Sequence, residues 1–173
     1  MISWKSHALY LIDYQHWAND RLLEALDTLD DAMRTQEIAG KSATGLLREM
    51  VTLDRQWLER LQHGAHPEPV DLPPHEWREL KSAVRLTFRQ IQHFLESKQS
   101  DWFEGEIGWR VGTQAEAHHW VTDVVTCLCE TNTRLRGQVL LLLPHLGAPV
   151  VDINYLLYRR EMKQSLENAR RMG

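Results

Sequence analysis

The chain has 173 residues, of which 43% are hydrophobic and 25% are charged, a composition typical of one soluble domain with a substantial core. Its formal net charge of −4 argues against non-specific nucleic-acid binding, which relies on a basic surface. No apolar run approaches the roughly 20 residues that span a bilayer, and the N-terminus lacks a signal-peptide cleavage site. We therefore expect a single cytoplasmic domain over residues 1–173 that contacts neither nucleic acid nor membrane.

Apolar residues recur every three or four positions in the first hundred residues, which predicts three amphipathic helices. The first spans about residues 6–29, with Ser6 as its N-cap, and the second spans about residues 42–62, before Gly64. A Pro-rich loop, HPEPVDLPPHE, follows. The third helix spans about residues 75–98, with Pro74 placed for its first turn. Its predicted buried stripe is Trp77, Leu80, Val84, Phe88, Ile91 and Leu95.

The segment DWFEGEIGWRVG, residues 101–112, has a different character, because its aromatic and β-branched residues are interrupted by glycines. This pattern predicts a short hairpin. Residues 113–116, TQAE, match a capping box that opens a fourth helix reaching about His145, with Gly147 as its C-terminal cap. A shorter basic amphipathic helix is predicted for about residues 154–171. The fold class is therefore all-α: an antiparallel four-helix bundle with a hairpin-like insertion before the fourth helix and a short C-terminal helix.

Three stretches, in chain order, resemble the DinB/YfiT-like family of four-helix bundles. YQHWANDRLLEAL, residues 14–26, is similar to the first helix of that family. LLREMVTLDRQWLERL, residues 46–61, is similar to its second helix, and Arg136-Gly137-Gln138-Val139 followed by Leu146-Gly147 is similar to the end of its fourth.

The resemblance implies a metal site whose ligands are substituted in this chain. Family members commonly hold nickel or zinc with three histidines, one on the second helix and two at i, i+4 on the fourth, and characterised relatives include thiol-dependent transferases and isomerases. The matching positions are Glu49, five residues before Asp54, and Thr131 and Leu135, before Arg136. Leucine cannot bind a metal, and a lone threonine is a poor ligand for nickel or zinc. We expect no cofactor, with a nickel or zinc ion as the less favoured alternative.

Glu49, Thr131, Leu135 and Gln138 are the candidate pocket residues. For Glu49 the sequence leaves open an ion pair with Arg134 or Arg136, or a solvated place at the mouth of the bundle. Thr131 and Leu135 continue the apolar stripe of the fourth helix and indicate a packed seam, whereas Glu49 and Gln138 favour a residual polar pocket.

Among the nine histidines of the chain, no two have i, i+4 spacing on a predicted helix. The adjacent His118 and His119, near the predicted start of the fourth helix, could join Glu116 or Asp123 in a relocated site, but a structural or solvated role is favoured. Among the tryptophans, Trp17, Trp57, Trp77 and Trp120 are predicted to pack in the core. Trp102 and Trp109 could line a pocket or a protein interface, and the interface is favoured.

Cys127 and Cys129 lie two residues apart on a helix, where they face different sides. We therefore expect two reduced thiols, at least one of them packed as a small hydrophobic side chain. Neither has a helix N-terminus to lower its pKa, so nucleophilic catalysis finds little support.

Two hypotheses for the function remain. The first is a ligand-binding or interaction protein, expected as a homodimer, which binds no metal and could hold a small molecule in the bundle pocket. The alternative is a metal- or carboxylate-dependent enzyme of the thiol-transferase or hydrolase type found in the family, using Glu49 and a non-standard site.

Overall fold

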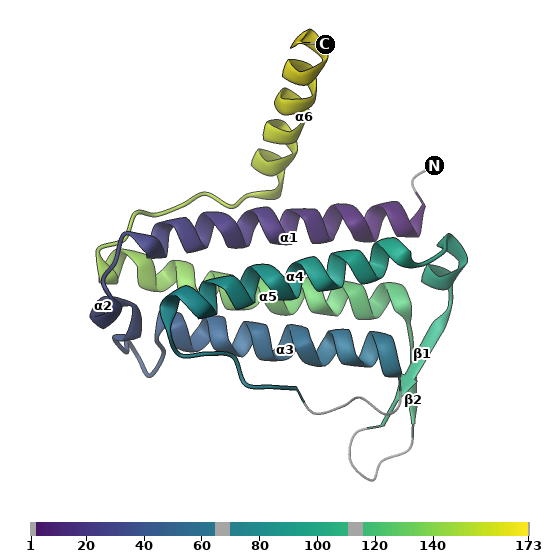
Figure 1. The fold of residues 1–173 in the computed structure, drawn as a ribbon, viewed down its shortest axis with the longest axis horizontal. Helices are drawn as coiled ribbons and strands as arrows, with labels where there is room; N and C mark the ends of the chain where they lie inside the picture. The colour runs from purple at the N-terminus through teal and green to yellow at the C-terminus, as the bar shows by residue number, and fades with distance from the viewer. Residues whose placement is uncertain (1–2, 65–69, 111–115, 173) are drawn as a thin grey trace.

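Four long helices pack side by side in the computed structural model, which describes residues 3–64, 70–110 and 116–172 (Figure 1). They are α1 (Trp4–Asp27), α3 (Ala43–His63), α4 (Trp77–Ser97) and α5 (Val121–Leu146). The shorter elements are α2 (Asp31–Thr35), the 3-10 helix η1 (Ser100–Glu104), strands β1 (Glu106–Trp109) and β2 (Ala117–Trp120), and α6 (Tyr155–Met172). The predicted helical bundle with a small hairpin and a C-terminal helix is confirmed.

Each long helix packs against two of the others: α1 against α4 and α5, and α3 against the same two. The directions differ from the predicted antiparallel arrangement, because residues 70–76 run back along the bundle to the start of α4 (Figure 1). Arg55, in the middle of α3, donates a hydrogen bond of 2.8 Å to the carbonyl of Asp71 in this returning segment. As a result α3 and α4 run in the same direction, as do α1 and α5.

Helix ends follow local capping chemistry. Ser3 rather than Ser6 caps α1, since its hydroxyl accepts from the Ser6 N–H at 3.2 Å. Ser42 caps α3 in the same way, accepting from the Gly45 N–H at 3.1 Å. Gly147 ends α5 with a φ of +77°, a left-handed conformation that glycine adopts without strain.

The start of the fourth long helix was predicted wrongly. Helix α5 begins at Val121, because residues 117–120 pair with residues 106–109 as an antiparallel hairpin, with Ile107 opposite His119. The predicted capping box lies mostly at 113–115, outside the described residues. Trp120 was expected in the core, but it lies on the strand and is 53% exposed.

Aromatic contacts fix the hairpin to the bundle. The Trp109 ring stacks on His119 at 4.6 Å and meets Trp57 of α3 edge-on at 5.7 Å. Trp102 packs against Phe94 of α4 and against Phe103. Both residues expected at an interface therefore make ring contacts within the chain.

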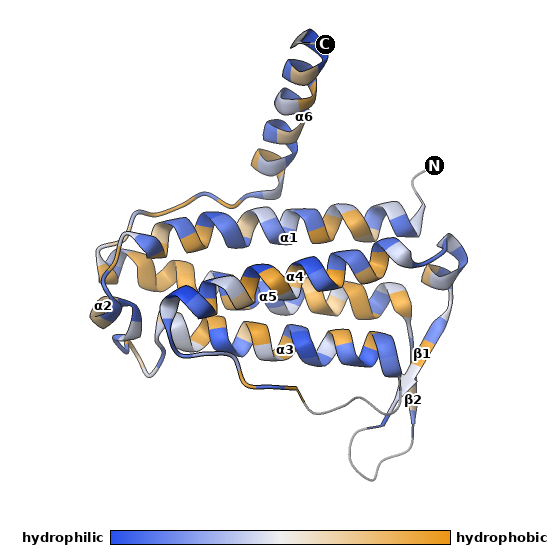
Figure 2. Ribbon diagram, in the orientation of Figure 1, coloured by the Kyte–Doolittle hydropathy of each residue, from blue (hydrophilic) through white to orange (hydrophobic). Residues whose placement is uncertain are grey.

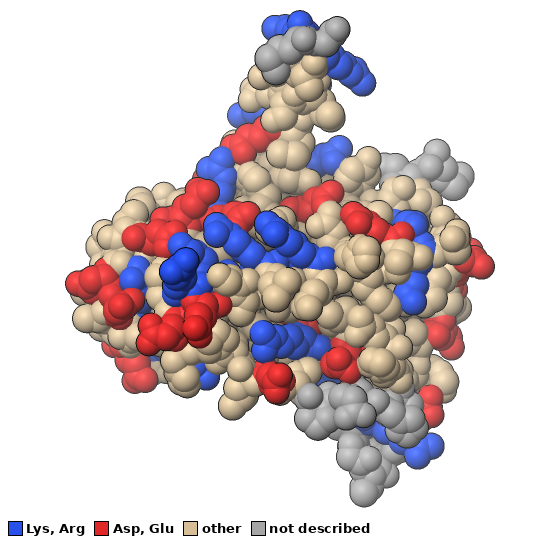
Figure 3. Space-filling view, viewed as in Figure 1, with Lys and Arg blue, Asp and Glu red and all other residues tan. Residues whose placement is uncertain are grey.

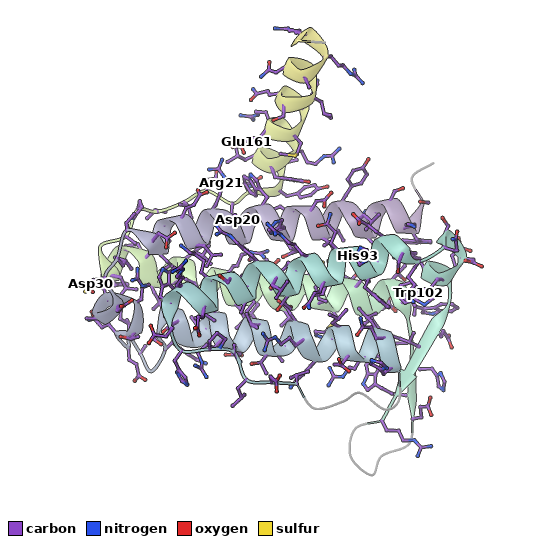
Figure 4. All side chains as sticks on the ribbon, viewed as in Figure 1. Asp20, Arg21, Asp30, His93, Trp102 and Glu161 are labelled. Atoms are coloured by element: carbon purple, nitrogen blue, oxygen red, sulfur yellow. The ribbon has the colours of Figure 1, made fainter. Side chains whose placement is uncertain are left out.

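Helix α6 projects away from the bundle, and only its first part contacts α1 (Figure 1). Glu161 accepts hydrogen bonds from Trp17 Nε1 at 3.0 Å and from Arg21 at 2.5 Å, and Figure 4 shows Arg21 and Glu161 side by side between the two helices. Positive and negative side chains are intermingled over the viewed face (Figure 3). Among the described helices, none has the length and apolarity to cross a membrane.

Every long helix carries both hydrophobic and hydrophilic residues along its length (Figure 2). The buried apolar residues form two clusters. The cluster at the α2 end contains the later part of α1, the start of α3 and α4, and residues 135–146 of α5. The cluster at the hairpin end contains Ile12, Leu58, Phe88, Phe103 and Leu128 among others. The predicted α4 stripe from Leu80 to Leu95 is buried across both clusters. Buried polar side chains lie between the two clusters.

Candidate functional site: a polar layer and an interhelical pocket

A layer of buried polar side chains crosses the middle of the bundle between the two apolar clusters. We call this the polar layer: Gln15 and Asn19 of α1, Asp54 of α3, and Asn132 and Arg136 of α5. None of the five is more than 2% exposed. Burying polar groups costs free energy unless they are hydrogen-bonded, so the hydrogen-bond partners of each residue decide what its burial costs.

Asp54 and Asn132 form one half of the polar layer. Asn132 Nδ2 donates to Asp54 Oδ1 at 2.6 Å and to the Leu128 carbonyl at 3.1 Å. Burial raises the pKa of the Asp54 carboxyl to about 7, against the opposing effects of the Asn132 hydrogen bond and the Arg136 charge. Asn132 Oδ1 has no hydrogen-bond partner among the described residues. A protonated Asp54 would supply one, because its O–H can donate to that oxygen while the amide N–H bonds back.

Arg136 forms the other half. Its guanidinium donates to Asn19 Oδ1 at 3.0 Å and to Thr133 Oγ1 at 3.1 Å, and lies 5.6 Å from the centre of the Tyr14 ring. Its Nε finds no partner among the described residues, and no ion pair to this guanidinium is present in that part of the chain. Burial lowers the pKa of Arg136, but an arginine remains charged at neutral pH. The bundle therefore holds a buried cation whose hydrogen-bond acceptors are neutral.

A pocket of about 560 Å³ adjoins the polar layer, between α1 and α5. We call it the interhelical pocket. Its α1 wall consists of His7, Leu11, Tyr14 and Gln15, its α5 wall of Thr126, Cys129, Glu130, Thr133 and Arg134, and Tyr155 of α6 also lines it. The volume lies within the range of small-molecule sites.

Three residues connect the interhelical pocket with the polar layer. Gln15 belongs to both, and its Oε1 has no hydrogen-bond partner among the described residues. Thr133 and Tyr14 line the pocket and touch the Arg136 guanidinium on their other side. The Tyr14 hydroxyl donates to the Ile153 carbonyl at 2.8 Å, and the Tyr155 ring packs edge-on against Tyr14 at 5.1 Å.

The two cysteines have different environments, as expected from their spacing. Cys127 is exposed, whereas Cys129 is buried at the pocket wall. Burial raises the pKa of the Cys129 thiol to about 12, so the thiolate that a nucleophile requires is scarce at neutral pH. The pocket therefore presents this sulfur as a weakly polar surface.

The four residues expected to form a pocket lie elsewhere. Leu135 is fully buried in the cluster at the α2 end, and Thr131 and Gln138 are half-buried. The Glu49 side chain is 39% exposed and pairs with Lys41 at 3.7 Å rather than with Arg134 or Arg136. None of the four lines the interhelical pocket.

These residues do not fit a three-ligand metal site, because Leu135 has no donor atom and is sealed among apolar side chains. Among the described residues, no three histidine, cysteine, aspartate or glutamate side chains are grouped to hold a metal ion. His118 and His119 lie on β2 and are exposed. His118 Nε2 is 3.7 Å from Glu116, one of the two partners considered for it.

Sequence reasoning missed the polar layer, although its signal was present. Asn132 and Arg136 have the i, i+4 spacing of the family's ligand pair, displaced by one residue along α5. Asn19 and Asp54 both fall inside the quoted family stretches. Polar residues in an amphipathic helix normally indicate its solvent face, which is why the buried set was not recognised.

Comparisons with known proteins found one family and one solved structure that the chain resembles. A family model described as "DinB family" matches residues 5–169. A crystal structure of a DinB-like protein from Bacillus cereus is similar, with a TM-score of 0.64 and 17% sequence identity, covering 83% of this chain and 95% of that one. At this identity the likeness concerns the fold alone. The search of curated proteins found no match.

Proposed function

This chain belongs to the DinB family, and from that premise we propose that it is a ligand-binding member that works without a metal ion and holds a small molecule in the interhelical pocket. One observation carries the proposal. The Gln15 amide is 2% exposed and lines the pocket, yet its Oε1 has no protein partner among the described residues. A buried acceptor left unsatisfied costs about 1–3 kcal/mol, and a ligand with a hydrogen-bond donor would remove that cost.

The walls of the pocket suit a largely apolar molecule. Leu11, Tyr14 and Tyr155 offer aliphatic and aromatic surface, and Gln15 and Thr133 offer polar groups next to the polar layer. This is the usual composition of a small-molecule site: an apolar lining with a few oriented polar groups. The alternative function, an enzyme using Glu49, has less support because that carboxylate pairs with Lys41 away from the pocket.

Filling the pocket should weaken binding of an apolar probe. We expect the neutral fluorescent probe N-phenyl-1-naphthylamine to bind the protein, and Thr126→Trp, which places an indole at the pocket wall, to weaken its affinity about tenfold or more, which corresponds to about 1.4 kcal/mol. Cys127→Trp is the matched control, because the neighbouring residue on the same helix is exposed and does not line the pocket. Equal affinities for Thr126→Trp and the parent protein would show that the probe binds elsewhere and would overturn the proposal.

Metal content gives a separate test of the metal-free part of the proposal. Since Leu135 offers no donor and Glu49 is paired with Lys41, protein purified without chelator should contain far less than one metal ion per chain. Elemental analysis of the purified protein measures this directly. Near-stoichiometric nickel, zinc or iron would contradict it. The homodimer and the cytoplasmic location expected from the sequence remain predictions.

A further inference from the structure

We infer that the molecule held in the interhelical pocket is an amphipathic monoanion, a carboxylate on an apolar body, with its carboxylate directed towards Arg136. This inference rests on the proposed function, since it names the chemical class of ligand for the same pocket. It follows from the electrostatics around one buried cation.

The Arg136 guanidinium is fully buried and bonded to two neutral oxygens, those of Asn19 and Thr133. Its Nε is unpartnered, and within the described residues no carboxylate lies in ion-pair range of it. A buried charge without a counter-charge costs several kcal/mol, and a charged acceptor forms a hydrogen bond roughly twice as strong as a neutral one. A carboxylate that reached this guanidinium would therefore stabilise the protein as well as bind to it.

Asp54 is the carboxylate of the polar layer and its charge is felt at Arg136, but its side-chain hydrogen bond is to Asn132. Burial raises the pKa of this carboxyl to about 7, so its negative charge is only partly present near neutral pH. The layer thus retains excess positive charge on the side that faces α1 and the pocket.

One lining residue, Thr133, links the pocket to this charge. Thr133 lines the pocket and accepts from Arg136 Nη2, while its own hydroxyl donates to the Cys129 carbonyl at 2.9 Å. A carboxylate beside Thr133 would compete with that hydroxyl as the stronger acceptor for Arg136. The Gln15 amide lies at the same end and could bond to the head group in either orientation.

Charges at the pocket rim do not select the same sign. Glu130 and Arg134 are both exposed lining residues of opposite charge, and His7 lies on the facing helix. Because exposed charges are screened by solvent, the buried guanidinium is the dominant fixed charge on the head group. One cation suits a single negative charge rather than a dianion such as a phosphate monoester.

The test compares two ligands that differ only in the head group: octanoate and 1-octanol, each displacing N-phenyl-1-naphthylamine. Desolvation alone favours the alcohol, so octanoate binding more tightly by about tenfold would mark recognition of the charge. The readout is the ratio of the two affinities, in which a general loss of pocket integrity cancels. Arg136→Met, which keeps an unbranched aliphatic stem but removes the guanidinium and its charge, should lower this ratio about tenfold or more.

Two further variants make the result decisive. Arg134→Met removes the exposed rim arginine from the same helix and should leave the ratio near that of the parent protein. Asn19→Asp places a carboxylate where Asn19 now accepts from Arg136, and should lower the ratio by supplying the missing counter-charge internally. This variant also decides the matter if Arg136→Met does not fold.

The failures are distinguishable. If octanoate shows no advantage, or if Arg134→Met rather than Arg136→Met removes it, the anion inference is wrong, while displacement blocked by Thr126→Trp still supports a pocket ligand. If Thr126→Trp leaves both ligands bound as in the parent protein, the pocket is not their site and the proposed function fails with the inference.

Discussion

Replacing Asp54 with asparagine should make the variant gain about 4 kcal/mol of stability relative to the parent protein between pH 4 and pH 8. The ordinary pKa of an aspartate is 3.8, and burial raises that of Asp54 to about 7 in the folded chain. At pH 4 and above, the unfolded chain gives up this proton, whereas the folded chain holds it until about pH 7. Because the folded state binds more protons over this interval, the free energy of unfolding falls as the pH rises, by about 1.4 kcal/mol for each pH unit.

The asparagine variant lacks this dependence, since its amide does not titrate. Its Oδ1 can still accept from Asn132, and its N–H can donate to the Asn132 Oδ1 that now has no partner among the described residues. Urea denaturation of both proteins from pH 4 to pH 8 gives the difference, in which the titration of the other carboxylates cancels. Glu49→Gln serves as a control, because this partly exposed, Lys41-paired carboxylate should change stability by no more than about 0.5 kcal/mol. A difference between parent and Asp54→Asn that does not vary with pH would contradict the buried, proton-holding Asp54.

Asn19→Leu should destabilise the protein by about 3 kcal/mol at pH 7. Leucine has the same branched arrangement of four side-chain heavy atoms as asparagine, but it lacks the oxygen that accepts from the buried Arg136 at 3.0 Å. Removing one partner of a buried charged group leaves that charge without compensation, which typically costs about 3–5 kcal/mol, and the remaining bond to Thr133 places the expected loss at the lower end.

Asn19→Asp is the matched variant, because it keeps the acceptor and adds a negative charge beside the cation. It should lose clearly less stability than Asn19→Leu in the same urea denaturation. If the leucine variant is as stable as the parent protein, or less affected than the aspartate variant, Arg136 is not a buried cation that depends on Asn19.

The sequence predicted the helices well, because long period-3.6 patterns such as Leu80 to Leu95 can bury their apolar face in only one way. It did not predict the parallel pairs α1/α5 and α3/α4. Their direction depends on the connection that follows Gly64, whose Pro-rich composition indicates an extended loop without indicating where it leads. The predicted start of α5 was wrong for a different reason. Residues 117–120 are exposed on both faces of strand β2, so they lack the alternation of apolar and polar residues that indicates a strand.

The candidate site was harder to predict. Counting along the family pattern located the three substituted positions, and Leu135 lies buried in a seam as its neighbours indicated. The candidate site instead involves Asn132 and Arg136, whose burial depends on which side of α5 faces α1 and α3. That rotation is set by packing between helices and cannot be derived from one helix alone.

Tyr155 has a double position, as a wall of the interhelical pocket and as the first residue of α6. Tyr14 also contacts both the pocket and the approach to α6. It lines the pocket, and its hydroxyl donates to the carbonyl of Ile153, in the segment that leads into α6. Where a change in the orientation of α6 moves Tyr155, that change is linked to occupancy of the pocket: a molecule that binds more tightly with Tyr155 in its present place favours this orientation, and a partner that binds the helix in this orientation raises the affinity of the pocket by the same factor. The orientation of α6 would then depend on whether the interhelical pocket is occupied.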